Sequence, residues 1–278
     1  MIDFQNVSFS YGEESSGGGI RNVNLTINTG EFVLLTGESG CGKTTITRLV
    51  NGLVPHYYEG NLEGDVLLDG KSVSDTPLYD LAAMVGSVFQ NPKSQFFNVD
   101  TDSELAFACE NLGYPQEDIL KRIDRTVSDY HIEDLMGRSV FALSGGEKQK
   151  IACASSSVLL PGIMVLDEPS SNLDMAAIDD LRQVLSLWKK QGKTILVAEH
   201  RLYYLHDLAD RVLYVKDGEI EREYTPAEFD SLSDGTRKEM GLRPFSLSKL
   251  KPANQYQAHT AKPVSYTHLR AHETCADL

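Results

Sequence analysis

The chain has 278 residues, of which 41% are hydrophobic and 24% charged, a globular composition that suits one α/β domain or two small ones. Its net charge of −14 argues against binding to nucleic acid, which requires a dense surface of Lys and Arg. No stretch approaches the ~18 consecutive apolar residues of a membrane span, and the first residues do not resemble a signal peptide. The cysteines form neither a C-x-x-C pair nor a cluster with histidine, so we expect no zinc, no disulfide framework and a reduced, cytosolic compartment.

The N-terminal part of the sequence predicts several strands, one of which is followed by a glycine-rich loop and a helix. Apolar residues at strand-like spacing predict strands at 2–9, 20–27, 32–35 and 66–68. The Gly/Ser-rich stretch Glu13–Gly19 predicts a hairpin loop between the first two. A helix is predicted from Lys43 to Leu53, directly after the glycine-rich loop. This order is the beginning of a βαβ unit.

The rest of the ordered pattern predicts alternating helices and strands. Buried strands are predicted at 163–166, 194–198 and 211–215, and a helix at 175–190. Such alternation indicates a mainly parallel sheet with helices on both faces. The mostly helical block at about 95–160, interrupted at 113–115, breaks the alternation. We therefore expect it to form a subdomain of its own.

The end of the chain follows a different pattern. We expect the folded domain to cover residues 1–235 and residues 236–263 to be a linker or C-terminal extension, because 243–263 is proline-containing and lacks periodicity. Residues 264–278 continue no pattern, and we interpret them as read-through from a cloning vector; a native disordered tail is the alternative. Because this segment begins abruptly, we hypothesise that the chain is the N-terminal half of a longer protein cut during cloning.

The first motif is Gly37–Thr44, GESGCGKT, which matches G-x-x-x-x-G-K-[ST]. Its glycines let successive backbone N–H groups turn toward phosphate oxygens, and the helix that follows adds its positive dipole end. We expect Lys43 to reach the β- and γ-phosphates of ATP and the Thr44 hydroxyl to ligate Mg²⁺. The residues predicted to bind nucleotide here are Gly37, Glu38, Ser39, Gly40, Cys41, Gly42, Lys43, Thr44 and Thr45.

A pair of carboxylates follows the predicted strand 163–166. Asp167 and Glu168 lie at its carboxyl end, where ligands bind in parallel sheets. We expect Asp167 to complete the Mg²⁺ shell and Glu168 to polarise the attacking water. An ordinary acidic turn is the alternative, and the phosphate-binding loop makes the catalytic interpretation the stronger one.

The sequence Leu143–Glu147, LSGGE, predicts the beginning of a helix. Ser144 suits the N-cap and Glu147 suits the position three residues later, which together make a capping box. The glycines between them also expose backbone N–H groups to an anion such as a γ-phosphate. We therefore predict two roles, capping and nucleotide binding, for Ser144, Gly145, Gly146 and Glu147.

In this order, the phosphate-binding loop, LSGGE and the LDEP sequence at 166–169 resemble the ATP-binding-cassette family over about residues 1–230. The resemblance implies a P-loop NTPase (RecA-like) α/β core with a mainly parallel sheet, an N-terminal antiparallel β subdomain and an inserted α-helical subdomain. Glu147 stands where the family commonly has Gln, and we expect activity to survive this difference.

The resemblance also implies roles for residues outside these motifs. Tyr11 falls where the family stacks an aromatic ring on adenine, and Gln90 falls at the Q-loop, which touches Mg²⁺ or water and senses a membrane partner. The stretch Ser171–Asp174 resembles the D-loop and places Asp174 among the nucleotide-site residues. His200 matches the switch histidine that contacts the γ-phosphate, so the implied catalytic residues are Glu168, His200 and Lys43.

A narrower likeness surrounds the Q-loop. The stretches Val88–Gln95 and Glu104–Gly113 look like those of the ATPases of energy-coupling-factor importers, which take up vitamins and metal ions. This likeness implies that a transmembrane subunit docks near Gln90–Asn98. The chain is then expected to be cytoplasmic and peripheral on the inner face of the cell membrane.

We expect ATP to lie between the P-loop of one cassette and Ser144–Glu147 of a second one, identical, different or fused. A soluble relative acting in translation or DNA repair is the alternative. A repair ATPase would carry a long coiled coil, but only about 100 residues without sustained heptads separate Thr44 from Ser144. A translation factor would need two cassettes and basic surfaces, which the acidic net charge opposes. A non-catalytic regulatory cassette should lack Glu168 or His200, and both are present.

Overall fold

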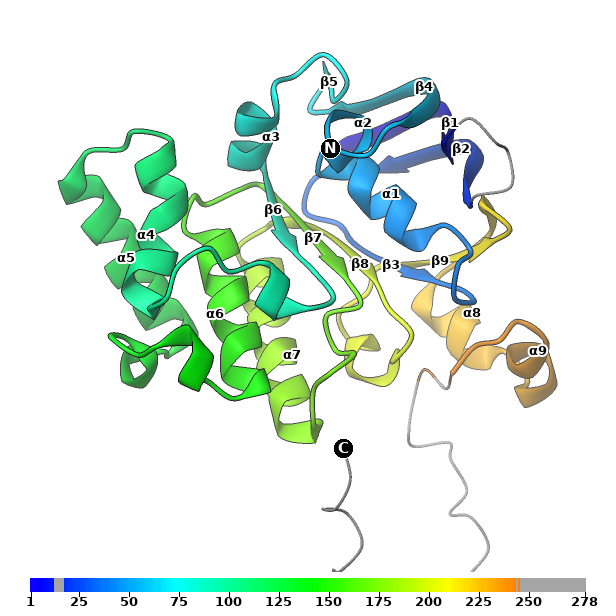
Figure 1. Ribbon diagram of the computed structural model, residues 1–278. Coiled ribbons are helices and arrows are strands. Elements are labelled where there is room, and N and C mark those ends of the chain that lie inside the picture. Colours follow the sequence, from blue (N-terminus) through cyan, green and yellow to red (C-terminus); the bar gives the residue numbers. More distant parts are fainter. Residues whose placement is uncertain (13–17, 244, 246–278) are drawn as a thin grey trace, which may run out of the picture. The chain divides into compact units, whose positions relative to one another are not determined.

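The computed structural model describes residues 1–12, 18–243 and 245, all within the compact unit Met1–Ser246. Two sheets form its framework, with strand orders β2-β1-β4-β5 and β10-β9-β3-β8-β7-β6 (Figure 1). The strands are β1 (Ile2–Tyr11), β2 (Gly19–Ile27), β3 (Phe32–Thr36), β4 (Gly60–Leu68), β5 (Lys71–Ser72), β6 (Val85–Val88), β7 (Ile163–Asp167), β8 (Thr194–Ala198), β9 (Arg211–Lys216) and β10 (Glu219–Tyr224).

Helices separate most of the strands of the larger sheet. The α-helices are α1 (Lys43–Val50), α2 (Leu53–His56), α3 (Leu78–Met84), α4 (Thr101–Asn111), α5 (Gln116–Tyr130), α6 (Gly145–Ser157), α7 (Met175–Lys190), α8 (Pro226–Ser231) and α9 (Asp234–Glu239). Short 3-10 helices occur at Pro92–Ser94, Glu133–Leu135, Val140–Ala142 and Tyr203–Leu205. The predicted helix 175–190 and strand 194–198 have the predicted bounds.

The smaller sheet is antiparallel, as the family resemblance implies. Strand β1 pairs with β2 on one side and β4 on the other, and all three run antiparallel to their neighbours. The buried residues of β1 are Ile2, Phe4, Val7 and Phe9, a spacing that skips one residue in the middle. A register shift between Phe4 and Val7 accommodates the extra residue, because a bulge returns the following side chains to the buried face.

The larger sheet is parallel except for β10, which pairs antiparallel with β9 at one edge. Alternate residues of its strands enter two different cores. In β3, Phe32 and Leu34 pack into one core, while Val33 and Leu35 pack into the other. Residues buried on both faces explain why these strands appear in the sequence as unbroken apolar runs.

Each face of the larger sheet is covered by different elements. Helix α1 shares a core with the antiparallel sheet, and α6 and α7 pack on the opposite face. Figure 1 shows α4 and α5 beside α6, away from the N-terminal sheet. The helices α4, α5 and α6 account for the helical block predicted at about 95–160. The predicted fold class is therefore confirmed.

The structure differs from the sequence-based expectation at the C-terminal boundary. The limit expected at residue 235 falls inside α9, and the compact unit continues to Ser246. Phe245 is fully buried and packs edge-to-face on Phe229, with ring centroids 5.2 Å apart. A single aromatic residue creates no periodicity, which is why the sequence did not reveal this anchor. Most of the expected linker at 236–263, the expected vector-derived segment at 264–278 and part of the Glu13–Gly19 loop lie outside the described residues.

Candidate active site

The phosphate-binding loop connects β3 to α1, as the sequence predicts. Its glycines Gly37, Gly40 and Gly42 have φ values of 150°, 80° and 111°, which favour residues without a side chain. A Cβ atom on Gly37 would lie 2.1 Å from the carbonyl oxygen of Val215 on β9. The loop is therefore shaped both by its own glycines and by the neighbouring strand.

Lys43 begins α1 and points back into this loop. Its side chain is almost fully buried, and Nζ donates hydrogen bonds to the carbonyl oxygens of Gly37 and Glu38 at 3.0 and 2.9 Å. The Cys41 sulfur lies 3.6 Å from the same nitrogen. An ammonium held by carbonyl oxygens at the centre of the loop can exchange these neutral acceptors for phosphate oxygens.

An oxygen-ligand pair lies next to the loop. The Thr44 hydroxyl donates a hydrogen bond of 3.1 Å to Oδ1 of Asp167 at the end of β7. Burial raises the pKa of Asp167, the Thr44 hydrogen bond offsets part of that effect, and the adjacent Glu168 raises it further. A buried carboxylate with a raised pKa gains from a nearby cation.

These two residues fit Mg²⁺, which prefers one or two carboxylates together with substrate phosphates. Among the described residues, no group of three or more His, Cys, Asp and Glu could hold a metal by itself. A bound Mg²⁺ would therefore depend on the oxygens of Thr44 and Asp167 together with those of a phosphate group.

Glu168 lies between two of the other predicted residues. Its Oε1 atom is 3.0 Å from Nε2 of His200, and its Oε2 accepts a hydrogen bond of 2.9 Å from the Gln90 amide. The Glu168 backbone has φ of 45° and its N–H donates to the carbonyl of Ala198 at 2.8 Å. Gln90, Glu168 and His200 follow the adjacent parallel strands β6, β7 and β8, whose carboxyl ends meet at one edge of the sheet.

The pKa of His200 is lowered from its ordinary value. Burial is the larger cause and the positive charge of Lys43 adds to it, while the carboxylates of Glu168 and Glu199 act in the opposite direction. A lowered pKa favours the neutral imidazole near neutral pH, a form in which one ring nitrogen is a donor and the other an acceptor.

The LSGGE sequence begins α6 with the predicted capping box. The Ser144 hydroxyl accepts from the Glu147 backbone N–H at 3.3 Å, and Oε2 of Glu147 accepts from the Ser144 N–H at 2.6 Å. Arg138 forms an ion pair of 3.0 Å with the other oxygen of Glu147. The two hydrogen bonds with Ser144, and then Arg138, hold the pKa of Glu147 below its ordinary value.

Gly146 has a packing role, because a Cβ atom there would lie 2.7 Å from the Ala177 Cβ on α7. Asp174 caps that helix by accepting from the Ala177 N–H at 2.9 Å. Among the described residues, no hydrogen bond or ion pair joins Ser144–Glu147 to the P-loop. The structure therefore brings together the predicted residues of β3, β6, β7 and β8, and leaves the LSGGE sequence outside that cluster.

Tyr11 is turned toward α1. Its hydroxyl lies 3.2 Å from Oγ1 of Thr45 and accepts a hydrogen bond of 3.0 Å from Arg48. The Arg48 guanidinium also lies over the ring of Tyr58, 4.1 Å from its centroid. The sequence gives Arg48 only one local signal, its position one helical turn after Thr44, and does not predict it as a site residue.

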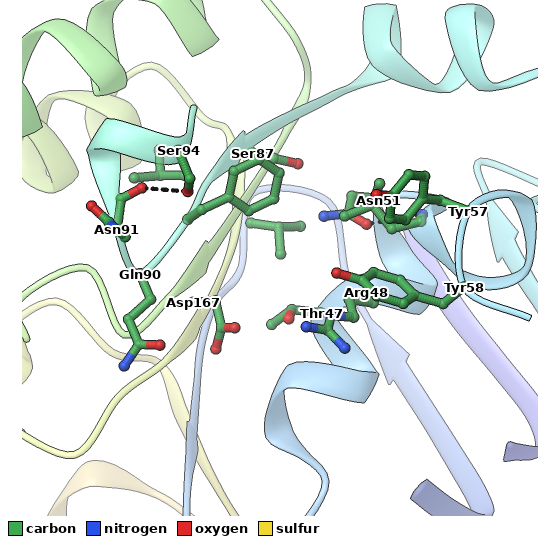
Figure 2. Close-up of a pocket in the computed structure, with 14 residues that line it drawn as sticks. Thr47, Arg48, Asn51, Tyr57, Tyr58, Ser87, Gln90, Asn91, Ser94 and Asp167 are labelled. Carbon is green, nitrogen blue, oxygen red and sulfur yellow. Dashed lines mark hydrogen bonds between the residues drawn. The ribbon is translucent and has the colours of Figure 1, made fainter. Parts of the chain in front are cut away.

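A cavity of about 490 Å³ opens beside the Thr44–Asp167 pair. Figure 2 shows Arg48 and Tyr58 on one side of it, Gln90 and Asn91 on the other, and Asp167 between them. A second, mainly apolar groove of about 410 Å³ lies next to the Q-loop. The aromatic residues lining that groove are Tyr79, Phe89, Phe97 and Phe107.

Four features define the ATP-binding-cassette class of ATPase domain. A phosphate-binding loop with its lysine, a partly buried Thr–Asp oxygen pair and a Glu–His pair lie at one edge of the sheet, and an LSGGE sequence begins α6. Residues 20–171 match the family model described as ABC transporter. A putative ABC transporter ATP-binding protein of Pyrococcus abyssi is 40% identical over 229 residues, which cover 82% of this chain and 81% of that protein. The chain belongs to the ABC transporter family.

Solved structures agree with this assignment. The chain is similar to cbiO1 from Clostridium perfringens, part of the ABC transporter complex cbiONQ, with a TM-score of 0.73 and 27% identity, covering 85% of this chain and 93% of cbiO1. It is also similar to the dimeric ATP-binding cassette MJ0796 bound to ADP and Pi, with a TM-score of 0.70 and 26% identity, covering 81% of this chain and 99% of that one.

Longer relatives match the same region. A putative ABC transporter ATP-binding protein of Treponema denticola is 46% identical over 251 residues, which cover 90% of this chain but 51% of the relative. The chain thus spans about half the length of the first curated relatives that it matches. In the part of the chain that the structure describes, no helix has the length and apolar character needed to cross a membrane.

Proposed function

We propose that this chain binds Mg-ATP and hydrolyses its γ-phosphate to energise a membrane importer. The observation that carries the proposal is the position of Glu168, 3.0 Å from His200 and 2.9 Å from Gln90, directly after the metal-ligand candidate Asp167. A carboxylate held by two side chains at a phosphate-binding edge can accept a proton from an attacking water and keep that water oriented.

Each residue of the cluster then has a chemical task. Lys43 exchanges its loop carbonyls for β- and γ-phosphate oxygens and stabilises the charge that develops on the transferred phosphoryl group. His200, with its lowered pKa, contacts the γ-phosphate as a neutral donor. Thr44 and Asp167 would hold Mg²⁺, which supplies charge neutralisation of the phosphates. Tyr11 is proposed to contact the adenine ring once its hydroxyl leaves Thr45.

The site is proposed to need a second cassette. The N–H groups at the beginning of α6, after Ser144, suit an anion, yet they belong to a part of the chain with no bond to the P-loop among the described residues. MJ0796 forms a dimer in its structures. We therefore infer that Ser144–Glu147 of one cassette covers the ATP on the P-loop of another, which is identical, different or fused in one chain.

The apolar groove beside the Q-loop supports docking to a transmembrane subunit near Gln90–Asn98. Phe97 is 75% exposed and stacks on Phe107 with ring centroids 4.7 Å apart, and Tyr79, which also lines the groove, is 63% exposed. Exposed aromatic residues in a groove are typical of protein interfaces. The cbiO1 likeness supports an importer of the energy-coupling-factor type, for a vitamin or a metal ion, with this chain on the cytoplasmic face of the membrane.

The decisive experiment is ATP hydrolysis measured against protein concentration, for the wild type and for Ser144→Arg. A shared site predicts specific activity that rises with concentration in the wild type. In Ser144→Arg, nucleotide binding is retained and hydrolysis falls to background, because the large cation blocks closure of the second cassette onto the ATP. Hydrolysis at a rate independent of protein concentration by monomers would rule out the shared site.

Docking is tested separately with Phe97→Glu. This charge in the apolar groove should abolish co-purification with the membrane subunits of the source organism and leave ATP hydrolysis unchanged. A variant that still co-purifies would remove the groove from the docking proposal, and a soluble role would become the better interpretation.

A further inference from the structure

A buried carboxylate that has no task in the proposed mechanism lies directly beside the switch histidine. Glu199 follows β8 and is 1% exposed, although its neighbour His200 reaches the site. A charged group at this depth is unfavourable unless hydrogen bonds compensate for the lost water. The donors that surround Glu199 therefore indicate what it is for.

Both carboxylate oxygens of Glu199 accept hydrogen bonds. Oε1 accepts from the backbone N–H groups of His200 and Arg201 at 2.7 and 3.0 Å. Oε2 accepts from the backbone N–H of Ser170 at 3.2 Å and from the Tyr204 hydroxyl at 2.9 Å. One oxygen thus holds the loop after β8, and the other holds the turn after β7.

These two segments carry the Glu–His pair of the site. The turn that contains Ser170 is closed by a hydrogen bond of 3.1 Å from the Ser171 N–H to the Glu168 carbonyl. On the other side, the Arg201 guanidinium donates to the Leu173 carbonyl at 3.0 Å. Glu199 is therefore the buried centre of a network that joins the His200 loop to the backbone between Glu168 and the D-loop.

We propose that Glu199 is a positioning residue that locks the His200 loop to the Glu168 turn. Through this lock, His200 and Glu168 keep one relative geometry, and a displacement of His200 by the γ-phosphate is transmitted to the D-loop at Ser171–Asp174. The inference rests on the proposed ATPase function and adds to it a residue that does not touch the nucleotide.

The network requires a carboxylate. Glutamine has the same length but replaces one acceptor oxygen by an NH₂ donor, which would face backbone N–H groups on one of the two sides. Aspartate is shorter by one methylene and cannot span the same distance. Glu199→Gln therefore keeps the volume of the side chain and disrupts the hydrogen bonds to one of its two oxygens.

The test compares Glu199→Gln with Glu31→Gln. Glu31 is also a largely buried carboxylate that accepts a backbone N–H, from Asn28 at 2.8 Å, but at the opposite end of β3. We expect Glu199→Gln to bind MgATP with a Kd within about twofold of the wild type while kcat falls about tenfold or more, because misplaced reacting groups cost rate rather than binding. Glu31→Gln should retain both within about twofold.

A second comparison separates positioning from a general loss of structure. In a His200→Ala background, Glu199→Gln should change the single-turnover rate less than about twofold, because residues that act through one another are not additive. If Glu199→Gln does not fold, Tyr204→Phe provides the same comparison, because it removes one donor to Glu199 and leaves the backbone donors in place.

The outcomes are distinguishable. An unchanged kcat in a folded Glu199→Gln variant of an active wild type, or an equal loss in both backgrounds, would overturn the positioning role. A wild type that does not hydrolyse ATP at any concentration would instead overturn the proposed function.

Discussion

Charged residues are paired with opposite charges at the amino end of the larger sheet, whereas two carboxylates are adjacent at its carboxyl end. At the amino end, Arg211 pairs with Glu31 and Glu223 at 3.0 and 2.7 Å, and Lys189 pairs with Asp210 at 2.6 Å. At the carboxyl end, Asp167 and Glu168 are adjacent in the chain, and the buried Lys43 donates to loop carbonyls. One end has matched charges, and at the other the pKa of Asp167 is raised by burial first and by the adjacent Glu168 in addition.

This difference shows what each end is for. A paired end is satisfied by its own side chains, so it contributes to folding and needs no ligand. An end with like charges and a cation held by neutral acceptors is less favourable by itself, and we propose that Mg²⁺ and phosphates complete it. Unfavourable electrostatics at one edge of a well-packed sheet are typical of functional sites.

The largest effect is expected from removing the cation of the carboxyl end. Lys43→Ala should raise the Kd for ATP about 10²-fold or more, because two charge-assisted contacts to phosphate of ~1.5–3 kcal/mol each are lost, and hydrolysis should disappear. Equilibrium binding of a fluorescent ATP analogue measures this. Lys71→Ala, at an exposed position in strand β5, is the matched control, and tight binding by Lys43→Ala would remove the lysine from the phosphate site.

The next effect separates chemistry from binding at the same end. Glu168→Gln should retain ATP binding and lower kcat by about 10²-fold or more, the usual contribution of a positioned base. It should also accumulate an ATP-bound dimer, measurable by size-exclusion chromatography with light scattering. Near-normal turnover would show that Glu168 is not the base.

A smaller effect is expected at the amino end, and it should concern stability alone. Arg211→Met leaves Glu31, 11% exposed, without its cation and should lower the free energy of unfolding by ~1–3 kcal/mol. Each kcal/mol corresponds to a Tm decrease of ~2–4 °C. Lys121→Met, which breaks an exposed helix pair, should change stability by less than ~0.5 kcal/mol. A loss of kcat in folded Arg211→Met at low temperature would contradict the division between the two ends.

The smallest effect is a pH dependence from His200. Because its pKa in the folded state is lowered by burial and by Lys43, the stability linked to its neutral form is complete above the unfolded-state pKa. That stability is lost as the pH falls below that value, with a slope of at most ~1.4 kcal/mol per pH unit. We therefore expect urea unfolding at pH 7.5 and 5.5 to show that the free energy of unfolding of the wild type, relative to that of His200→Gln, is lower at pH 5.5 than at pH 7.5. A constant difference would contradict the lowered pKa.

Features whose partners are near in sequence could be predicted. The P-loop glycines and Lys43 act within eight consecutive positions, and the Ser144–Glu147 capping box is also local. The strands β7 and β8 are apolar runs because both faces of the sheet are buried. The role of each predicted site residue stays a prediction, although the structure gathers most of them at one edge.

Features whose partners are distant in sequence could not be predicted from it. The Phe245 anchor depends on Phe229 and His206, which meet it only in the folded chain. Arg48, on α1, belongs to the site because it contacts Tyr11, which lies on β1 of the smaller sheet. Its helical position alone carries no information about that contact.

The sequence by itself determined the family, the order of strands and helices and the position of the glycine-rich loop proposed to bind phosphate, because these depend on local spacing and on runs of apolar residues. Only the tertiary structure decided how the loops after β6, β7 and β8 meet. In the sequence, Glu199 is an ordinary acidic residue before a histidine. In the structure, its four hydrogen-bond donors come from positions up to 29 residues away. The parallel pairing of β7 and β8 brings those donors together, so the positioning role that we propose for its buried carboxylate depends on the folded protein.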